Sequence, residues 1–263
     1  MEPIALLRGI DQGCPLSGIL FQFYNTDLIY ICGPRGDESA VTFVDDTLLL
    51  ACSKTLNEAN EKVKKMMEQP GGGLDWSRSH HCNFAMDKFG VMGLTRRREP
   101  NPAKRPPTRP TQRHLLFLQG AKIPAVEVHK FLGVLIDQEL RLKEHLNYTL
   151  CKGTKWVMQC GRLAKPTKGI SAKYMRRFYL SVAVPRMLYA TELFLTPQSR
   201  KSQGTKGFIN KLGRIQRQAS LHITGVMKTT PTYTINACTD LLPFHLLVTK
   251  LTHCAAMHLP TLP

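Results

Sequence analysis

Two adjacent carboxylates, Asp45 and Asp46, are the side chains in this 263-residue sequence best suited to chemistry. They interrupt a β-rich apolar segment at residues 41–51, VTFVDDTLLLA. Two short apolar runs around a pair of acids predict a tight hairpin with the carboxylates at its tip. Mg²⁺ prefers carboxylate oxygens and keeps waters and substrate phosphates at its other positions, so the pair suits metal-dependent phosphoryl transfer. Adjacent acids in a turn also occur simply as solvated turn residues.

The segments around residues 41–51 must position the two acids. Residues 14–30 open on a Gly-Cys-Pro turn and then carry apolar side chains at helical spacing, which predicts a helix with one apolar face. A Thr-x-x-Glu capping box predicts a second helix over residues 55–69, which Pro-Gly-Gly-Gly ends. Residues 84–94 are predicted to form a strand with Lys88 at its centre.

The middle of the chain differs in composition from the segments before it. Residues 95–113 hold seven Lys or Arg and five Pro with no apolar period, which predicts an extended, mobile basic insert that either links elements or binds RNA. A hairpin with strands near residues 114–118 and 128–136 is predicted next. Apolar side chains at helical spacing predict helices beyond it, with a kink near Pro185, and residues 229–263 are expected to form short helical or irregular pieces.

The charge of the chain is large and unevenly placed. Lys and Arg number 36 against 19 Asp and Glu, a net charge of +17. Residues 1–90 carry a net charge of −4, whereas residues 91–263 carry +21. Such an excess implies a polyanionic partner, most often nucleic acid. An acidic part that could hold metal is thus joined to a basic part that could hold phosphate backbone, although a solvated basic surface without a ligand is the simpler alternative.

The spacing of the cysteines and the first residues of the chain indicate the cellular compartment of the protein. The eight cysteines are scattered without a CxxC or other zinc spacing, as expected for reduced thiols inside a cell. The first residues lack the basic region and apolar core of a secretory signal, and the longest uncharged stretch near them is too short to span a bilayer. We therefore expect an intracellular protein, nuclear or cytoplasmic, that is not secreted and has no membrane partner.

Four motifs follow one another along the chain: Gln-Gly-Cys-Pro-Leu-Ser at residues 12–17, Phe-Val-Asp-Asp at 43–46, Trp-Ser at 76–77 followed by Lys88, and Phe-Leu-Gly-Val at 131–134. In this order and approximate spacing they resemble the reverse transcriptases of non-LTR, LINE-like retrotransposons. The resemblance covers nearly the whole chain, and the joint match is more specific than any one motif. It implies an RNA-directed DNA polymerase that uses Mg²⁺ and acts on an RNA template and DNA primer, or an RNA–DNA duplex.

The resemblance implies a role for each motif. The first turn and the helix after it would line the template and the incoming nucleotide through four residues, Gln12, Gly13, Pro15 and Ser17. Asp45 would bind catalytic metal and Asp46 would support the same metal site. Lys88 would lie near the nucleotide phosphates as a candidate general acid for pyrophosphate release, or serve only as a solvated lysine. The primer grip would contain an apolar tripeptide that would also suit a core strand, Phe131, Leu132 and Gly133.

One departure from the family is serious. The chain begins just before the Gln-Gly turn, so the fingers and the strand that bears the family's other metal-binding Asp have no counterpart in it. A two-metal site without one bridging carboxylate loses much of its transition-state stabilisation. We therefore expect an N-terminally truncated, C-terminal part of the polymerase domain with little activity by itself.

The predicted fold is α+β. It comprises a partial palm of antiparallel sheet and helices over residues 1–94, the insert over 95–113, a primer-grip hairpin over 114–137, a helical thumb over 138–200 and a basic C-terminal connection over 201–263. One alternative function is a non-catalytic, nucleic-acid-binding remnant of a retroelement. Another is a relic that folds poorly, because a palm without all its strands exposes unpaired sheet edges.

Overall fold

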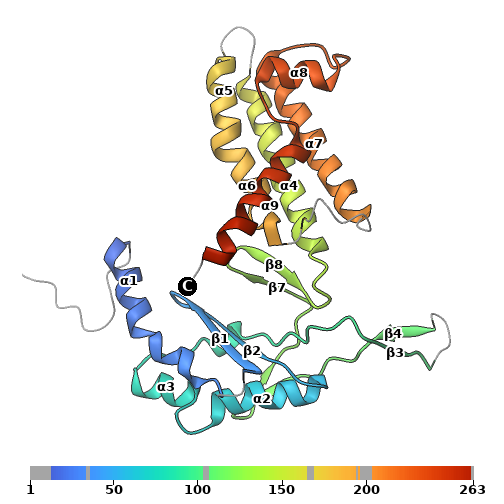
Figure 1. The fold of residues 1–263 in the computed structure, drawn as a ribbon. Helices are drawn as coiled ribbons and strands as arrows, with labels where there is room; N and C mark the ends of the chain where they lie inside the picture. The colour runs from blue at the N-terminus through green and yellow to red at the C-terminus, as the bar shows by residue number, and fades with distance from the viewer. Residues whose placement is uncertain are drawn as a thin grey trace, which may run out of the picture. The chain divides into compact units, whose positions relative to one another are not determined.

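The computed structural model describes residues 13–33, 36–102, 107–164, 169–193, 195 and 203–261, with side chains from residue 206 in the last range. The chain divides into two compact units, Met1–Leu140 and Arg141–Pro263 (Figure 1). The first unit combines helices with all the strands of the described residues, and the second is helical.

The first unit opens on a helix and a hairpin. Helix α1 (Pro15–Tyr24) continues into the 3-10 helix η1 (Thr26–Ile31), so the helix predicted over residues 14–30 is present but tightens after its first half. Strands β1 (Glu38–Phe43) and β2 (Asp46–Ala51) pair antiparallel, and this is the predicted hairpin. Strand β1 begins earlier than the sequence pattern indicates.

Helix α2 (Leu56–Glu68) separates two small apolar clusters of the first unit. The Thr55 side chain accepts a 3.3 Å hydrogen bond from the Glu58 backbone N–H, which caps the helix as predicted. Met66 packs with residues of η1 and of α3 (Gly73–Ser79), whereas Met67 packs with later strands. Two consecutive side chains of one helix therefore enter different clusters.

The strand predicted over residues 84–94 is wrong. Met86–Lys88 forms a 3-10 helix, η2, because the Lys88 N–H bonds back to the carbonyl of Ala85 instead of to a neighbouring strand. Only Val91 makes a β-type bridge, in parallel with Ala125. A strand needs a ladder partner along its length, and among the described residues this segment meets one at a single position.

The basic insert is extended as predicted, but its described residues are hydrogen-bonded. Strands β3 (Arg98–Pro100) and β4 (Thr108–Pro110) form an antiparallel hairpin that projects from the other elements of the unit (Figure 1). At its base, Arg96 donates hydrogen bonds of 2.7 and 2.9 Å to the carbonyl oxygens of Glu139 and Leu140. Arg96, in an insert predicted either to link elements or to bind RNA, thus attaches the insert to its own unit.

Two hairpins stand where the sequence predicts one. Strands β5 (Leu116–Leu118) and β6 (Ala121–Ile123) form the first, and β7 (Val128–Phe131) and β8 (Val134–Asp137) form the second. Both turns have two central residues with positive φ, Gln119-Gly120 and Leu132-Gly133, the pattern of tight type I′ hairpins. Within the described residues all strands lie in two-stranded antiparallel ladders, which is compatible with the predicted α+β fold, and the predicted palm stays a prediction.

The second unit is built on two long helices, α4 (Lys143–Leu163) and α7 (Gln203–Thr224). Between them lie α5 (Ala172–Phe178), a π-helical segment (Tyr179–Ala183), α6 (Val184–Leu188) and the 3-10 turn η4 (Thr191–Leu193). Helices α8 (Thr232–Thr239) and α9 (Phe244–His258) and the short η5 (Leu259–Thr261) follow. The π-helical segment directly precedes Pro185, where the kink is predicted.

One core runs through this unit. It joins side chains of α4, α5, α7 and α9, including Trp156, Met175, Leu212 and Val248. The predicted boundary near residue 200 therefore falls inside a single packed unit, and α9 is a 15-residue core helix where the sequence predicts short or irregular pieces. Among the helices that the structure describes, none has both the length and the apolar character needed to cross a membrane.

Candidate active site at the Asp45-Asp46 hairpin

Asp45 and Asp46 lie where β1 turns into β2. Phe43 pairs with Asp46 as the last rung of the ladder, so Val44 and Asp45 form a two-residue turn. Val44 has a φ of 55°, a left-handed conformation that β-branched residues seldom adopt. Both carboxylates are exposed and accessible to a cation or a phosphate-bearing ligand.

Asn25 links this turn to the helix that precedes it. Its side-chain N–H donates a 2.7 Å hydrogen bond to the carbonyl oxygen of Val44, and its backbone N–H bonds at 2.9 Å to the carbonyl of Phe21 in α1. Asn25 is 4% exposed. The residue therefore holds the turn from the end of α1. Sequence reasoning missed it, since an Asn at a helix end is common and only its burial shows that it needs a partner.

The Gly-Cys-Pro turn starts α1 as predicted. Gly13 has a φ of 91°, which favours glycine, and Pro15 occupies the first turn of the helix. The Ser17 N–H donates a 3.1 Å hydrogen bond to the carbonyl of Cys14. Hydrogen bonds from backbone N–H groups of this turn lower the pKa of the Cys14 thiol. Gln12, the fourth predicted template-lining residue, lies outside the described residues.

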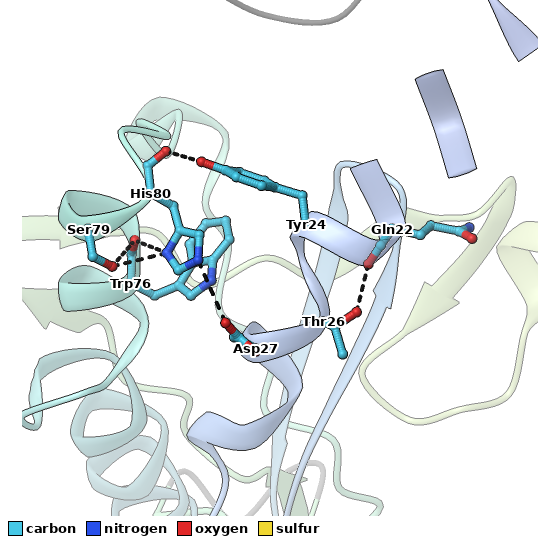
Figure 2. Close-up of polar contacts among 7 residues, drawn as sticks. All are labelled: Gln22, Tyr24, Thr26, Asp27, Trp76, Ser79 and His80. Atoms are coloured by element: carbon cyan, nitrogen blue, oxygen red, sulfur yellow. Dashed lines mark hydrogen bonds and ion pairs between the residues drawn. The ribbon is translucent and has the colours of Figure 1, made fainter. Parts of the chain in front are cut away.

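An aromatic cluster braces η1 against α3 beside this segment (Figure 2). The His80 ring stacks on Trp76 with centroids 4.6 Å apart and an interplanar angle of 17°. The Tyr24 hydroxyl donates to the carbonyl oxygen of His80, and the His80 Nε2 lies 3.8 Å from a carboxylate oxygen of Asp27. The cluster fixes the end of α1 at Tyr24, the residue before Asn25. It thereby supports the link to the hairpin tip.

Lys88 is exposed at the end of η2, a segment that packs against β6. The structure therefore places this candidate general acid on a short helix and not in a strand. Among the described residues, no hydrogen bond or ion pair joins Lys88 to Asp45 or Asp46. Its predicted catalytic role remains a prediction.

The predicted primer-grip residues form the tip of the β7–β8 hairpin. Phe131 pairs with Val134 in the last rung, and Leu132 and Gly133, with φ values of 46° and 83°, make the turn. Phe131 and Leu132 are half-buried. The tripeptide is therefore a hairpin tip, not the core strand that the sequence also allowed.

The donor set at residues 45 and 46 suits Mg²⁺ in part. In the part of the chain that the structure describes, no three His, Cys, Asp or Glu side chains are grouped closely enough to hold a metal ion. Two adjacent exposed carboxylates fit Mg²⁺ that completes its shell with waters and substrate phosphates. They do not make an all-protein metal cage.

Almost all the net charge belongs to the helical unit. Residues 141–263 carry 19 basic and 3 acidic side chains, a net of +16, whereas residues 1–140 carry 17 and 16, a net of +1. On α4, three exposed basic residues recur at helical spacing on one face, Lys152, Lys155 and Arg162. We call these three residues the α4 basic stripe. Exposed Lys and Arg side chains suit contacts with phosphates that do not read sequence.

Comparison with known proteins gives one informative match. Over 230 residues the chain is 22% identical to the "RNA-directed DNA polymerase from mobile element jockey" of Drosophila melanogaster, and the match covers 86% of this chain and 22% of the relative. The chain thus spans less than a quarter of that relative's length. No protein-family model matches the chain, and no solved structure matches it. The similarity supports a distant, reverse-transcriptase-like relationship between this chain and a retrotransposon RNA-directed DNA polymerase.

Proposed function

We propose that this chain is a segment of a retrotransposon RNA-directed DNA polymerase, with part of the palm in the first unit and the thumb in the helical unit. The observation that carries the proposal is the exposed Asp45-Asp46 turn, held by Asn25 at the end of the helix that follows the Pro-Leu-Ser turn. Mg²⁺ held by these carboxylates would supply positive charge to a transferring phosphoryl group.

Three groups of residues in this chain would then have separate roles. Asn25 would fix the backbone before Asp45, so that both carboxylates keep one orientation. The β7–β8 tip, residues 131–133, would contact the primer. The α4 basic stripe would hold the RNA–DNA duplex through its phosphates, as expected from the net charge of +16 in that unit. Because the proposed partners are nucleic acids, the proposed site of action lies inside the cell.

We further propose that the chain by itself extends a primer poorly. The described residues offer two carboxylates at the turn and no third metal-binding side chain grouped with them. Nucleotidyl transfer by two metal ions uses a symmetric clamp on the attacking and leaving oxygens. Two adjacent side chains on one turn supply only part of such a clamp.

Manganese binding tests the proposed metal site directly. Mn²⁺ added to the purified chain with an RNA–DNA template–primer should broaden the backbone amide NMR signals of residues 43–47 before others. Asp45→Asn should remove this effect, whereas Asp87→Asn, which changes an exposed acid in η2, should not. The polymerase proposal fails if the tip shows no preferential broadening, or if Asp45→Asn leaves it unchanged.

A second candidate is a nucleic-acid-binding protein that uses no metal. The observation in its favour is the concentration of positive charge in the helical unit. It predicts duplex binding in EDTA that weakens steeply with salt, because phosphate contacts release counterions, with no manganese effect at residues 43–47. Primer extension that depends on Asp45 would overturn this candidate, and efficient extension of this kind would also overturn the proposed weak activity of the chain alone.

A further inference from the structure

A groove of about 860 Å³ lies in the helical unit, between α7, α8 and the first turn of α9. Its lining includes two residues with groups suited to a nucleotide, Arg214 and Tyr233. Neither belongs to the Asp45 turn or the α4 basic stripe. The groove therefore needs an explanation of its own.

The groove is electropositive. Arg214 is exposed. Its guanidinium makes no hydrogen bond or ion pair with another described residue. Asp240, the acidic residue in the lining, is paired with Arg176 at 2.6 Å. Helix α9 begins at the groove, has no acidic residue in its first turn and is 15 residues long, so its N-terminus adds partial positive charge. These features favour an anionic group such as a phosphate.

One further group favours a base beside that phosphate. Tyr233 is 78% exposed, which leaves its ring open to stacking. Any nucleobase can stack on such a ring, because every base has a π-face. An exposed aromatic ring beside a cation therefore matches a nucleobase joined to a phosphate.

The wall that carries Tyr233 is fixed. Arg217 donates to the Thr232 hydroxyl at 2.8 Å and to the carbonyl oxygens of Lys228 and Thr230 at 2.7 and 2.8 Å. These bonds hold the start of α8 on α7. The groove is therefore built before any ligand arrives, which lowers the entropic cost of binding.

We propose that this groove binds an unpaired nucleotide of single-stranded nucleic acid, with its base on Tyr233 and its phosphate at Arg214. The proposal rests on the proposed function and adds a single-strand site to the duplex site of the α4 basic stripe. Unpaired bases are required because a base inside a duplex is already stacked and cannot offer its face.

Fluorescence anisotropy with a labelled 12-nucleotide RNA and a labelled RNA–DNA duplex tests the proposal. Tyr233→Ala should weaken single-strand binding about fivefold or more, as expected for the loss of one base–aromatic stack, and leave duplex binding within about twofold. Tyr233→Phe should retain single-strand binding. Tyr174→Ala, which removes another exposed tyrosine of the same unit, should leave both affinities unchanged.

A second variant fills the groove without removing a polar group. A Cβ added at Gly213 would meet only Phe244, at 3.9 Å, so a side chain can start there, and Gly213→Leu should extend into the groove. It should reduce single-strand binding selectively, as Tyr233→Ala does. Equal loss of duplex binding in both variants, no loss in either, or displacement of the RNA by polyglutamate as readily as by unlabelled RNA would overturn the single-strand site. Failure of wild-type protein to bind the duplex would count instead against the proposed function.

Discussion

The side-chain amide of Asn25 lies 2.7 Å from the carbonyl oxygen of Val44, one residue before Asp45. Asn25→Ala removes the donor to a part-buried carbonyl, which should lower the free energy of unfolding of the first unit by about 0.5–1.5 kcal/mol. Amide hydrogen exchange at residues 44–46 should accelerate more than exchange in α2. Mass spectrometry of exchanged peptides would measure both.

Asn57→Ala is the matched control, because Asn57 is exposed on α2. It should leave exchange at the turn unchanged. If Asn25→Ala accelerates exchange equally throughout the first unit, the hydrogen bond stabilises the unit generally and does not hold the turn in particular.

Gly153 allows α4 to approach α6 and α7 closely. A Cβ there would lie 2.7 Å from the Met187 sulfur and 3.3 Å from a methyl of Ile215. Gly153→Val should therefore destabilise the helical unit by about 1–3 kcal/mol through overpacking. Chemical denaturation followed by circular dichroism would measure the loss.

Gly207 provides the opposite case on α7, since a Cβ there would meet no atom within 4 Å. Gly207→Ala should stabilise the unit by about 0.5–1 kcal/mol, because alanine is the better helix former. The packing explanation would be wrong if the two substitutions shifted stability in the same direction.

His145 should make the helical unit sensitive to acid. Burial lowers its pKa below the ordinary value of 6.5, and nearby Lys152 lowers it further, while a hydrogen bond to the Tyr189 carbonyl opposes both. The folded state therefore binds fewer protons than the unfolded state. Stability should be full above about pH 6.5 and fall as the pH drops toward the lowered folded pKa.

Thermal unfolding between pH 7.5 and pH 5 would show this effect. The melting temperature of the wild type should fall more than that of His145→Gln, which cannot titrate at this position. Identical pH profiles for the two proteins would assign the acid sensitivity to other groups.

Arg176 joins α5 to the end of α8 mainly through the backbone. Its guanidinium donates to the carbonyl oxygens of Thr239 and Asp240 at 2.6 and 2.7 Å, and to the Asp240 carboxylate at 2.6 Å. The Asp240 side chain is 92% exposed, so its ion pair is screened by water. Arg176→Lys should destabilise the unit by about 1–2 kcal/mol, and Asp240→Asn by less than about 0.5 kcal/mol. Urea denaturation of both variants would rank them, and the reverse order would refute the backbone explanation.

Local sequence signals predicted local structure well. The acid pair between two apolar runs predicted the β1–β2 hairpin, and the Thr55 capping box predicted the start of α2. Each depends on residues within a few positions of one another. The turn at Leu132-Gly133 escaped prediction because a leucine with a φ of 46° is atypical there.

Long-range partners could not be read from the sequence. Nothing near Asn25 points to Val44, and nothing in the run of arginines at residues 96–98 shows that Arg96 binds carbonyls 43 and 44 positions away. Apolar residues at 84–94 favoured a strand, but strand formation depends on a partner supplied from elsewhere. The groove beside Tyr233 likewise arises only when α7, α8 and α9 pack together.

Oxidation of Met66 and Met67 can report when the folded first unit opens. Their exposed fractions are 0% and 4%, so an oxidant such as hydrogen peroxide reaches them only when the folded unit opens. Oxidation to the sulfoxide would place a polar group in both apolar clusters, because each methionine belongs to a different one. The relative oxidation rates of two neighbouring side chains would therefore show whether the two clusters open together or one at a time.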